Sequence, residues 1–230
     1  MKRFDPVTQA RIDLTAALRS AARMGLNEGV CNHFSLELPG DPTKFLINPQ
    51  GFHWSDLTPA DLMVVDENGA VVEGKHKVEP TAFFIHGRIH LGKRKKCVLH
   101  THMPFATALT LLEGGELDVF ENQSAMRYYG RVGYDREYGG VALANEEGDR
   151  ICKALGDKNV VFMQHHGVIV CGDNWPMHST ISTTWSAAAW CRCWRKAPAA
   201  SSSTCRKKWS LKWPSRSKAS ARNPSSTSKR

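Results

Sequence analysis

The stretch CVLHTHMPFATAL, residues 97–109, carries an apolar run into two histidines and then into a proline. The apolar run predicts a buried β-strand, and Pro104 with the apolar residues after it predicts a helix. Residues i and i+2 of a strand share a face and lie about 6.6 Å apart, so His100 and His102 can converge on one ion. Because ten histidines occur in 230 residues, this spacing alone is weak evidence, and two ordinary histidines are the alternative.

A second stretch, FMQHHGVIVCG (residues 162–172), places His165 and His166 between two apolar runs. We predict two strands that meet at a turn, with Gly167 allowing a positive φ and a close backbone approach. Zinc binds neutral imidazole nitrogens, and catalytic zinc sites use three protein ligands with one position left open. The two stretches together indicate a metal site, with a polar hairpin tip as the alternative for the second.

The rest of the sequence alternates between helical and strand-like patterns. Asp5 is placed to cap a helix that begins at Pro6. A hairpin turn is expected at Glu67–Asn68–Gly69, whereas residues 115–145 give no clear assignment. Further strands are expected in CNHFSLEL, KFLINP and LMVVDENGAVVEG, and further helices in PTAFFIHGRIHLG and NEEGDRICKALGD. This interleaving predicts an α/β fold whose antiparallel or mixed sheet is covered by helices.

Another pair of histidines competes for a metal ion. His86 and His90 stand four residues apart on a predicted helix, a spacing that puts both side chains on one face. The segment between them lacks the glutamate of a zinc-protease helix. A partly exposed helix face is the alternative, and His86 could also line the pocket.

The charge is divided unevenly along the chain. The formal net charge is +9, but twelve of the 31 Lys and Arg residues and none of the 22 Asp and Glu residues lie in 174–230. Residues 1–173 therefore hold 19 basic and 22 acidic residues, a net charge of −3. We predict a folded domain over 1–173 and a basic, poorly ordered tail rich in Trp and Ser over 174–230. Such a tail could contact RNA or an anionic membrane, but the acidic domain supports neither partner, and we expect neither.

The tail shows no helical or strand periodicity, although tryptophan recurs among its Ser, Arg and Lys residues. We hypothesise a shifted reading frame, because moving codons for TTWSAAAWCRCWRKA by one base can yield an amphipathic helix. A genuine basic tail is the alternative. Resequencing the gene across residues 174–186 decides between them, since an intact frame there excludes the shift.

The sequence also indicates the compartment. No run reaches the roughly 18 apolar residues needed to cross a bilayer, and the N-terminal segment lacks the apolar core of a signal peptide. Seven cysteines at irregular spacings fit a reducing compartment better than a disulfide framework. We therefore expect a cytoplasmic protein.

Residues of about 7 to 173 resemble the class II aldolase/adducin family. Four segments match in the family's order: EGVCNHFSLEL, FLINPQGFHWSDLTPADLMVVDENG, KCVLHTHMPFATAL and FMQHHGVIVCG. The segment VEPTAFFIHGRIH is most similar to the adducin-like branch. The resemblance implies a three-layer α/β/α fold with a central, mainly antiparallel sheet, and a homotetramer that acts on small molecules.

The resemblance also implies roles for individual residues. It assigns the metal ligands to His100, His102 and His166, with His165 in the place of the family's asparagine. The implied cofactor is a divalent ion, zinc first, with manganese or another ion as the alternative. Catalytic candidates are Glu79, His86 and Tyr129, and substrate-binding candidates are Asn32, His33, Gln50, Gly51 and Thr81. Tyr128 and Tyr134 are further proton donors to consider, although all three tyrosines fit structural roles as well.

The chain departs from the family's sugar-phosphate aldolases at two places. Those enzymes carry Pro-Ser-Ser-Glu, whose serines bind phosphate and whose glutamate is the acid/base group, where this chain has Pro80-Thr81-Ala82-Phe83. Asn32-His33 also replaces the family's Gly-Asn. A non-phosphorylated carbonyl or carboxylate substrate is therefore expected, and the family's proton-transfer group is missing.

The resemblance implies a lyase that breaks a C–C bond, by aldol cleavage or decarboxylation, through a metal-stabilised enediolate. The alternative, from a different class, is a non-catalytic adducin-like binding module. Loss of the glutamate favours the module, and retention of three histidine ligands favours the enzyme.

Overall fold

The computed structural model describes residues 4–139 and 145–173. In that part of the chain, eight strands form one sheet in the order β4-β3-β2-β1-β5-β8-β7-β6. The strands are β1 His33–Leu38, β2 Asp41–Ile47, β3 Met63–Val65, β4 Val71–Glu73, β5 Cys97–Thr101, β6 Val132–Asp135, β7 Val160–Met163 and β8 Gly167–Gly172. Neighbouring strands are antiparallel except β6 and β7, which are parallel. The predicted mainly antiparallel sheet is confirmed.

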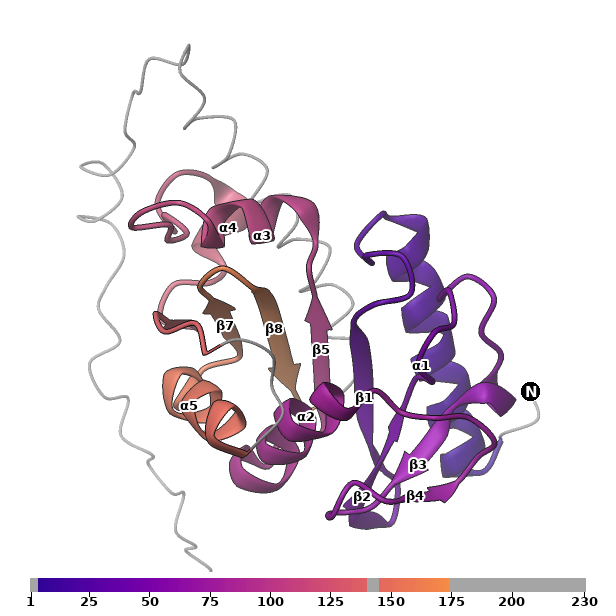
Figure 1. The fold of residues 1–230 in the computed structure, drawn as a ribbon. Coiled ribbons are helices and arrows are strands. Elements are labelled where there is room, and N and C mark those ends of the chain that lie inside the picture. Colours follow the sequence, from indigo (N-terminus) through magenta and orange to yellow (C-terminus); the bar gives the residue numbers. More distant parts are fainter. Residues whose placement is uncertain (1–3, 140–144, 174–230) are drawn as a thin grey trace, which may run out of the picture.

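Helices cover both faces of this sheet, so the fold has the three layers that the family resemblance implies (Figure 1). The helices are α1 Pro6–Arg23, the 3-10 helix η1 Pro59–Asp61, α2 Pro80–Lys93, α3 Pro104–Thr110, α4 Gln123–Met126 and α5 Asn145–Leu155. α1, α3 and α4 contribute to one hydrophobic core, whereas α2 and α5 pack on the other face. Successive β5 residues divide between the two: Leu99 belongs to the first core and Val98 to the second.

The local signals read from the sequence account for the boundaries of these elements. The Asp5 carboxylate accepts hydrogen bonds from the backbone N–H groups of Val7 and Thr8 at 3.1 and 3.0 Å, so the predicted helix cap is confirmed. Between β3 and β4, Asp66 accepts from two backbone N–H groups and Gly69 has a φ of 82°, which forms the predicted turn.

Two regions are to be compared with the sequence prediction separately. Residues 115–139, left unassigned from the sequence, contain α4 and β6. The predicted basic tail, residues 174–230, lies outside the described residues. Over the described ranges, no helix combines the length and apolarity that crossing a membrane requires.

Candidate metal centre

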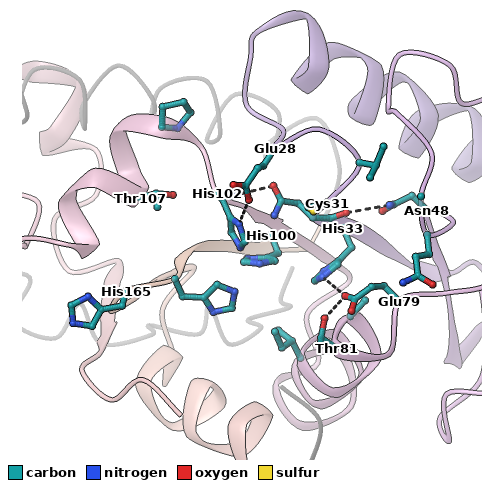
Figure 2. A pocket seen from close by; sticks show the side chains of 18 of the residues that line it. Glu28, Cys31, His33, Asn48, Glu79, Thr81, His100, His102, Thr107 and His165 are labelled. Atoms are coloured by element: carbon teal, nitrogen blue, oxygen red, sulfur yellow. Dashed lines mark hydrogen bonds and ion pairs between the residues drawn. The ribbon is translucent and has the colours of Figure 1, made fainter. Parts of the chain in front are cut away.

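Three histidines meet at one end of the sheet; Figure 2 labels two of them, His100 and His102. His100 lies in β5, His102 follows that strand directly, and His166 lies in the turn between β7 and β8. One ring nitrogen from each lies within 4.8 Å of the other two. The ring centroids are 4.9–5.0 Å apart, and each pair of rings meets edge to face. The structure therefore brings the three predicted ligands together around one point.

The turn that carries His166 is shaped differently from the prediction. His165, not Gly167, holds the positive φ, at 57°. Gly167 is required for close approach instead, since a Cβ there would lie 2.7 Å from the Thr101 carbonyl oxygen and 2.8 Å from His102 Cδ2. The predicted positive φ at Gly167 is thus wrong, while the predicted close approach is confirmed.

Hydrogen bonds orient two of the three rings, those of His100 and His102. His100 Nδ1 donates to the Val168 carbonyl at 3.2 Å, and His102 Nδ1 donates to Glu28 Oε2 at 2.5 Å, so Nε2 is the nitrogen of both rings that remains available to a metal ion. His102 Nε2 and His166 Nδ1 are buried and have no hydrogen-bond partner in the described part of the chain. Unpaired buried nitrogens are costly, and a metal ion satisfies them.

Burial also favours the neutral form of His100 and His166, which is the form that binds metals. It lowers the pKa of His100 well below its usual value and that of His166 to about 4, and the neighbouring histidines add to both shifts. The residues present therefore fit a divalent metal ion, with His100, His102 and His166 as its ligands.

Glu28 is the part of this centre that sequence reasoning missed. Its carboxylate orients His102 from an exposed loop before β1. A single acidic residue in a loop has no periodic signal, so only the fold shows that it faces a ligand 74 positions away.

The three histidines open onto a cavity of about 1040 Å³. Among the described residues, its lining includes no lysine or arginine. It includes all five predicted substrate-binding residues: Asn32, His33, Gln50, Gly51 and Thr81. Its remaining lining residues, beyond these and the three metal ligands, are Glu28, Val30, Cys31, Asn48, Pro49, Glu79, Ala82, Ile85, Pro104, Thr107, Ala108, Leu111, Tyr138 and His165.

Asn32 is the best-defined polar group of this lining. Its φ is 74°, its Oδ1 accepts the His102 backbone N–H at 3.1 Å, and only 7% of it is exposed. Its Nδ2 has no hydrogen-bond partner among the described residues, although it is buried. Asn48 holds the loop in place, because it accepts from the Phe34 N–H and donates to the Asn32 carbonyl. An oriented donor therefore lies next to the metal ligands.

Glu79 reaches the cavity from the N-terminus of α2. Its Oε2 lies 3.4 Å from His33 Nε2 and accepts a hydrogen bond from the Thr81 hydroxyl (Figure 2). The hydrogen bond with His33 lowers the pKa of Glu79, while burial lowers the pKa of His33 and Glu79 opposes that effect. Phe83, at the position of the family's glutamate, packs near Phe45 and is absent from the cavity lining.

The remaining catalytic candidates lie elsewhere. His86 is fully buried behind His33 and does not line the cavity. Among the described residues, His86 and His90 belong to no group of three potential metal ligands, and both rings are instead hydrogen-bonded to Ser35. Tyr129 is 47% exposed, contacts Phe120 and does not line the cavity.

The other two tyrosines have structural positions, whereas one that the sequence did not single out lines the cavity. Tyr128 is buried in the core, and Tyr134 accepts the Leu117 N–H. Tyr138 is in the cavity lining.

Comparison with known proteins agrees with the family resemblance found in the sequence. The family model described as "Class II Aldolase and Adducin N-terminal domain" matches residues 12–194. The chain belongs to this family. A Pseudomonas aeruginosa protein named for the class 2 aldolases is 32% identical over 166 residues, covering 71% of this chain and 62% of the relative. The chain thus spans less than two thirds of that relative's length.

Two further comparisons extend this result within the class II aldolase and adducin family. The decarboxylase NovR of Streptomyces niveus is 29% identical over 194 residues, covering 81% of this chain and 67% of NovR. The crystal structure of an aldolase II superfamily protein from Pseudomonas syringae matches with a TM-score of 0.79 and 25% identity, covering 91% of this chain and 92% of that one. The chain therefore shares its fold and family with proteins named as aldolases and as a decarboxylase.

Proposed function

We propose that the protein is a metal-dependent lyase that breaks a carbon–carbon bond, by aldol cleavage or decarboxylation, in a non-phosphorylated carbonyl or carboxylate compound. The observation that carries this proposal is the convergence of three histidines, two with buried and unpaired nitrogens. A divalent ion held there, zinc by preference for this ligand set, would supply Lewis-acid chemistry that polarises a substrate oxygen.

The chain's own residues supply the remaining functions of such a site. The free Nδ2 of Asn32 can donate a hydrogen bond to a substrate oxygen beside the metal ligands. Glu79, with His33 and Thr81, provides a carboxylate that can hold and transfer a proton at the cavity wall. Glu79 thus takes the role that Phe83 cannot perform. Tyr129 lies outside the cavity of its own chain, so we assign it no role within one subunit.

The lining favours a substrate without a phosphate group. A phosphate dianion needs cationic or clustered N–H donors, and the described lining includes no Lys or Arg. It does include three large apolar side chains that are 47–58% exposed: Val30, Leu111 and Tyr138. Burying such surface against a ligand is favourable, so we propose a carbonyl acid or aldehyde that carries an apolar substituent. The family relationship to a protein named as a decarboxylase supports this class.

We also propose that the protein works as a homotetramer, as the resemblance implies. Sedimentation equilibrium of the purified chain tests this, with four chains per particle expected and a monomer contradicting it.

A pair of adjacent histidines gives a matched test of the metal centre. His166→Ala should abolish stoichiometric metal binding, because it removes one of three ligands. His165→Ala should retain it, because this neighbouring ring lines the cavity but lies outside the three-histidine cluster. Metal content is measured by inductively coupled plasma mass spectrometry after dialysis, and near one divalent ion per wild-type chain is expected.

Activity is then screened with metal-loaded protein on hydroxy-keto acids and aldehydes. Turnover by the wild type, but not by His166→Ala, is expected. A folded wild-type protein that binds no divalent ion would overturn the lyase proposal and favour the non-catalytic binding module.

A further inference from the structure

Behind the cavity, buried polar side chains form a continuous hydrogen-bonded chain between α2 and β1. It begins at the Lys95 carbonyl oxygen, which lies 2.6 Å from His90 Nδ1. Ser35 Oγ lies 2.6 Å from His90 Nε2 and 2.5 Å from His86 Nδ1. His86 Nε2 lies 2.9 Å from His33 Nδ1, and His33 Nε2 faces Glu79.

These side chains are withdrawn from solvent. Ser35 and His86 are 0% exposed, His90 is 4% exposed and His33 is 6% exposed. The four residues come from facing surfaces, because His33 and Ser35 lie in β1 while His86 and His90 lie on α2, which packs on that face of the sheet. Their polar atoms therefore depend on one another for hydrogen bonds rather than on bulk water.

The first atom of the chain sets the direction of every hydrogen bond after it. A carbonyl oxygen only accepts, so His90 Nδ1 must donate to Lys95. Burial lowers the pKa of His90 to about 4 and that of His86 well below its usual value, so both rings are neutral near pH 7. His90 Nε2 is then an acceptor, and the Ser35 hydroxyl must donate to it.

The single hydrogen of the Ser35 hydroxyl also fixes the direction of the hydrogen bonds made by His86 and His33. Because the Ser35 hydrogen is used, Ser35 Oγ accepts from His86 Nδ1, and His86 Nε2 in turn accepts from His33 Nδ1. A neutral His33 would then turn the lone pair of Nε2 toward Glu79 Oε2, 3.4 Å away. The hydrogen bonds behind His33 therefore leave Nε2 as the ring nitrogen that faces the cavity wall.

We infer that Ser35, His86 and His90 are positioning residues that direct the Nδ1 hydrogen of His33 away from the cavity, so that the lone pair of His33 Nε2 faces Glu79 at the cavity wall. The reverse direction would place a lone pair of His90 Nδ1 against the Lys95 carbonyl oxygen at 2.6 Å. The direction of each hydrogen bond in this series is therefore fixed, and the series ends at His33 Nε2 in the site.

This arrangement deepens the proposed lyase function and rests on it for its catalytic meaning. In an aldol cleavage, the hydroxyl group loses its proton to His33 Nε2 as the C–C bond breaks, the hydroxyl carbon becomes a carbonyl carbon, and the electron pair of the broken bond stays on the other fragment. That fragment then takes the proton from His33 Nε2 to form a C–H bond, which returns His33 to the neutral ring with hydrogen on Nδ1. The hydrogen bonds behind His33 do not change during this cycle.

The test reads the tautomers of His86 and His90 directly, in metal-loaded protein without substrate. Magic-angle-spinning NMR of protein labelled with ¹⁵N in its histidine rings distinguishes protonated from bare nitrogens. The two signals are assigned by their loss in His86→Gln and His90→Gln. We expect hydrogen on Nδ1 and a bare Nε2 in both residues. Hydrogen on Nε2 of either residue overturns the inference.

Variants at Ser35 test whether the hydrogen bonds of Ser35 determine the tautomer of His86. Ser35→Ala should release His86 from the Nδ1–H form, and Ser35→Thr, which keeps a hydroxyl, should restore it. Thr15→Val is the matched control, because it removes another buried hydroxyl, which donates to the Arg11 carbonyl at 2.8 Å on α1. An unchanged His86 tautomer in Ser35→Ala overturns the inference.

Two readouts separate this inference from the proposed function. Metal content measured on the same samples reports on the function alone. If the protein binds metal but shows reversed tautomers, the inference on the hydrogen-bonded side chains is rejected and the lyase proposal is kept. If it shows the expected tautomers but binds no metal, the inference is kept and the lyase proposal is rejected. Once a substrate is found, Ser35→Ala should lower kcat on the order of 10²-fold with KM unchanged, whereas a merely structural role would change both.

Discussion

At the scale of single residues, Glu28 shows how a loop side chain acts on a metal site without touching it. Its carboxylate accepts from His102 Nδ1, which holds the ring in one tautomer and aims Nε2 at His100 and His166. A carboxylate partner also makes the imidazole a stronger base and hence a stronger ligand.

Glu28→Gln should therefore weaken metal binding by about 10- to 100-fold, because the amide loses the charge that supports His102. The measurement is a zinc titration against a competing chelator. Glu67→Gln is the control, since it removes the same charge from an exposed position in the β3–β4 turn and should leave the affinity unchanged. Equal affinities for both variants would show that the Glu28 contact does not support the ligand.

The residue scale also shows what sequence patterns can identify. His100, His102 and His166 could be selected because strand periodicity and a turn glycine are local signals. Whether Glu79 reached the cavity could not be decided, because that depends on where the first turn of α2 lies relative to His33 in β1. Tyr138 lines the cavity from a segment with no pattern at all.

At the scale of elements, α2 connects the site to the core. Its N-terminal end presents Glu79 and Thr81 to the cavity, its buried histidines face β1, and another part of its surface meets α5. Helical spacing showed that His86 and His90 share a face. It could not show that this face packs on a serine of β1, which turns two candidate metal ligands into a hydrogen-bonded chain.

The contact between α2 and α5 depends on Gly148. A Cβ at this position would lie 2.2 Å from the Phe84 carbonyl oxygen and 2.6 Å from Arg88 Cγ, so the helices would have to separate. Gly148→Ala should lower the free energy of unfolding by about 1–2 kcal/mol, because overpacking outweighs the gain in helix propensity.

Gly92→Ala is the matched control for this prediction. Gly92 also lies in a helix, but nothing lies within 4 Å of a Cβ there, so alanine should stabilise the protein by up to about 1 kcal/mol. Urea unfolding of both variants provides the comparison. The same sign of change in both would mean that helix propensity, rather than the contact between α2 and α5, dominates at Gly148.

At the scale of the whole molecule, the order of strands and helices follows local patterns, but the gathering of histidines does not. Six of them come together from β1, α2, the end of β5 and the β7–β8 turn: His33, His86, His90, His100, His102 and His166. Only the strand order, which places β1 beside β5 and β5 beside β8, brings these distant segments to one place. Residues 115–139 resisted assignment because their short elements depend on such long-range contacts.

Burying neutral histidines makes the stability of the fold depend on pH. In the unfolded chain His90 has its usual pKa of 6.5, whereas burial lowers it to about 4 in the folded protein. Below pH 6.5 the unfolded state therefore binds a proton that the folded state does not. The contribution of this histidine to the free energy of unfolding is fully present above pH 6.5. It falls as the pH decreases from 6.5 towards 4, by about 1.4 kcal/mol per pH unit for each such histidine.

His90→Gln isolates one contribution to this pH dependence, because glutamine does not titrate. The absolute stability of the variant should be lower, since it loses hydrogen bonds within the buried chain. Its further loss between about pH 6.5 and about pH 5 should nevertheless be smaller than that of the wild type by about 2 kcal/mol. Chemical unfolding at both pH values measures the two differences, and His53→Gln, at an exposed position, should keep the wild-type slope. A His90→Gln slope equal to the wild-type slope would mean that His90 already carries its proton in the folded state, or that solvent reaches it.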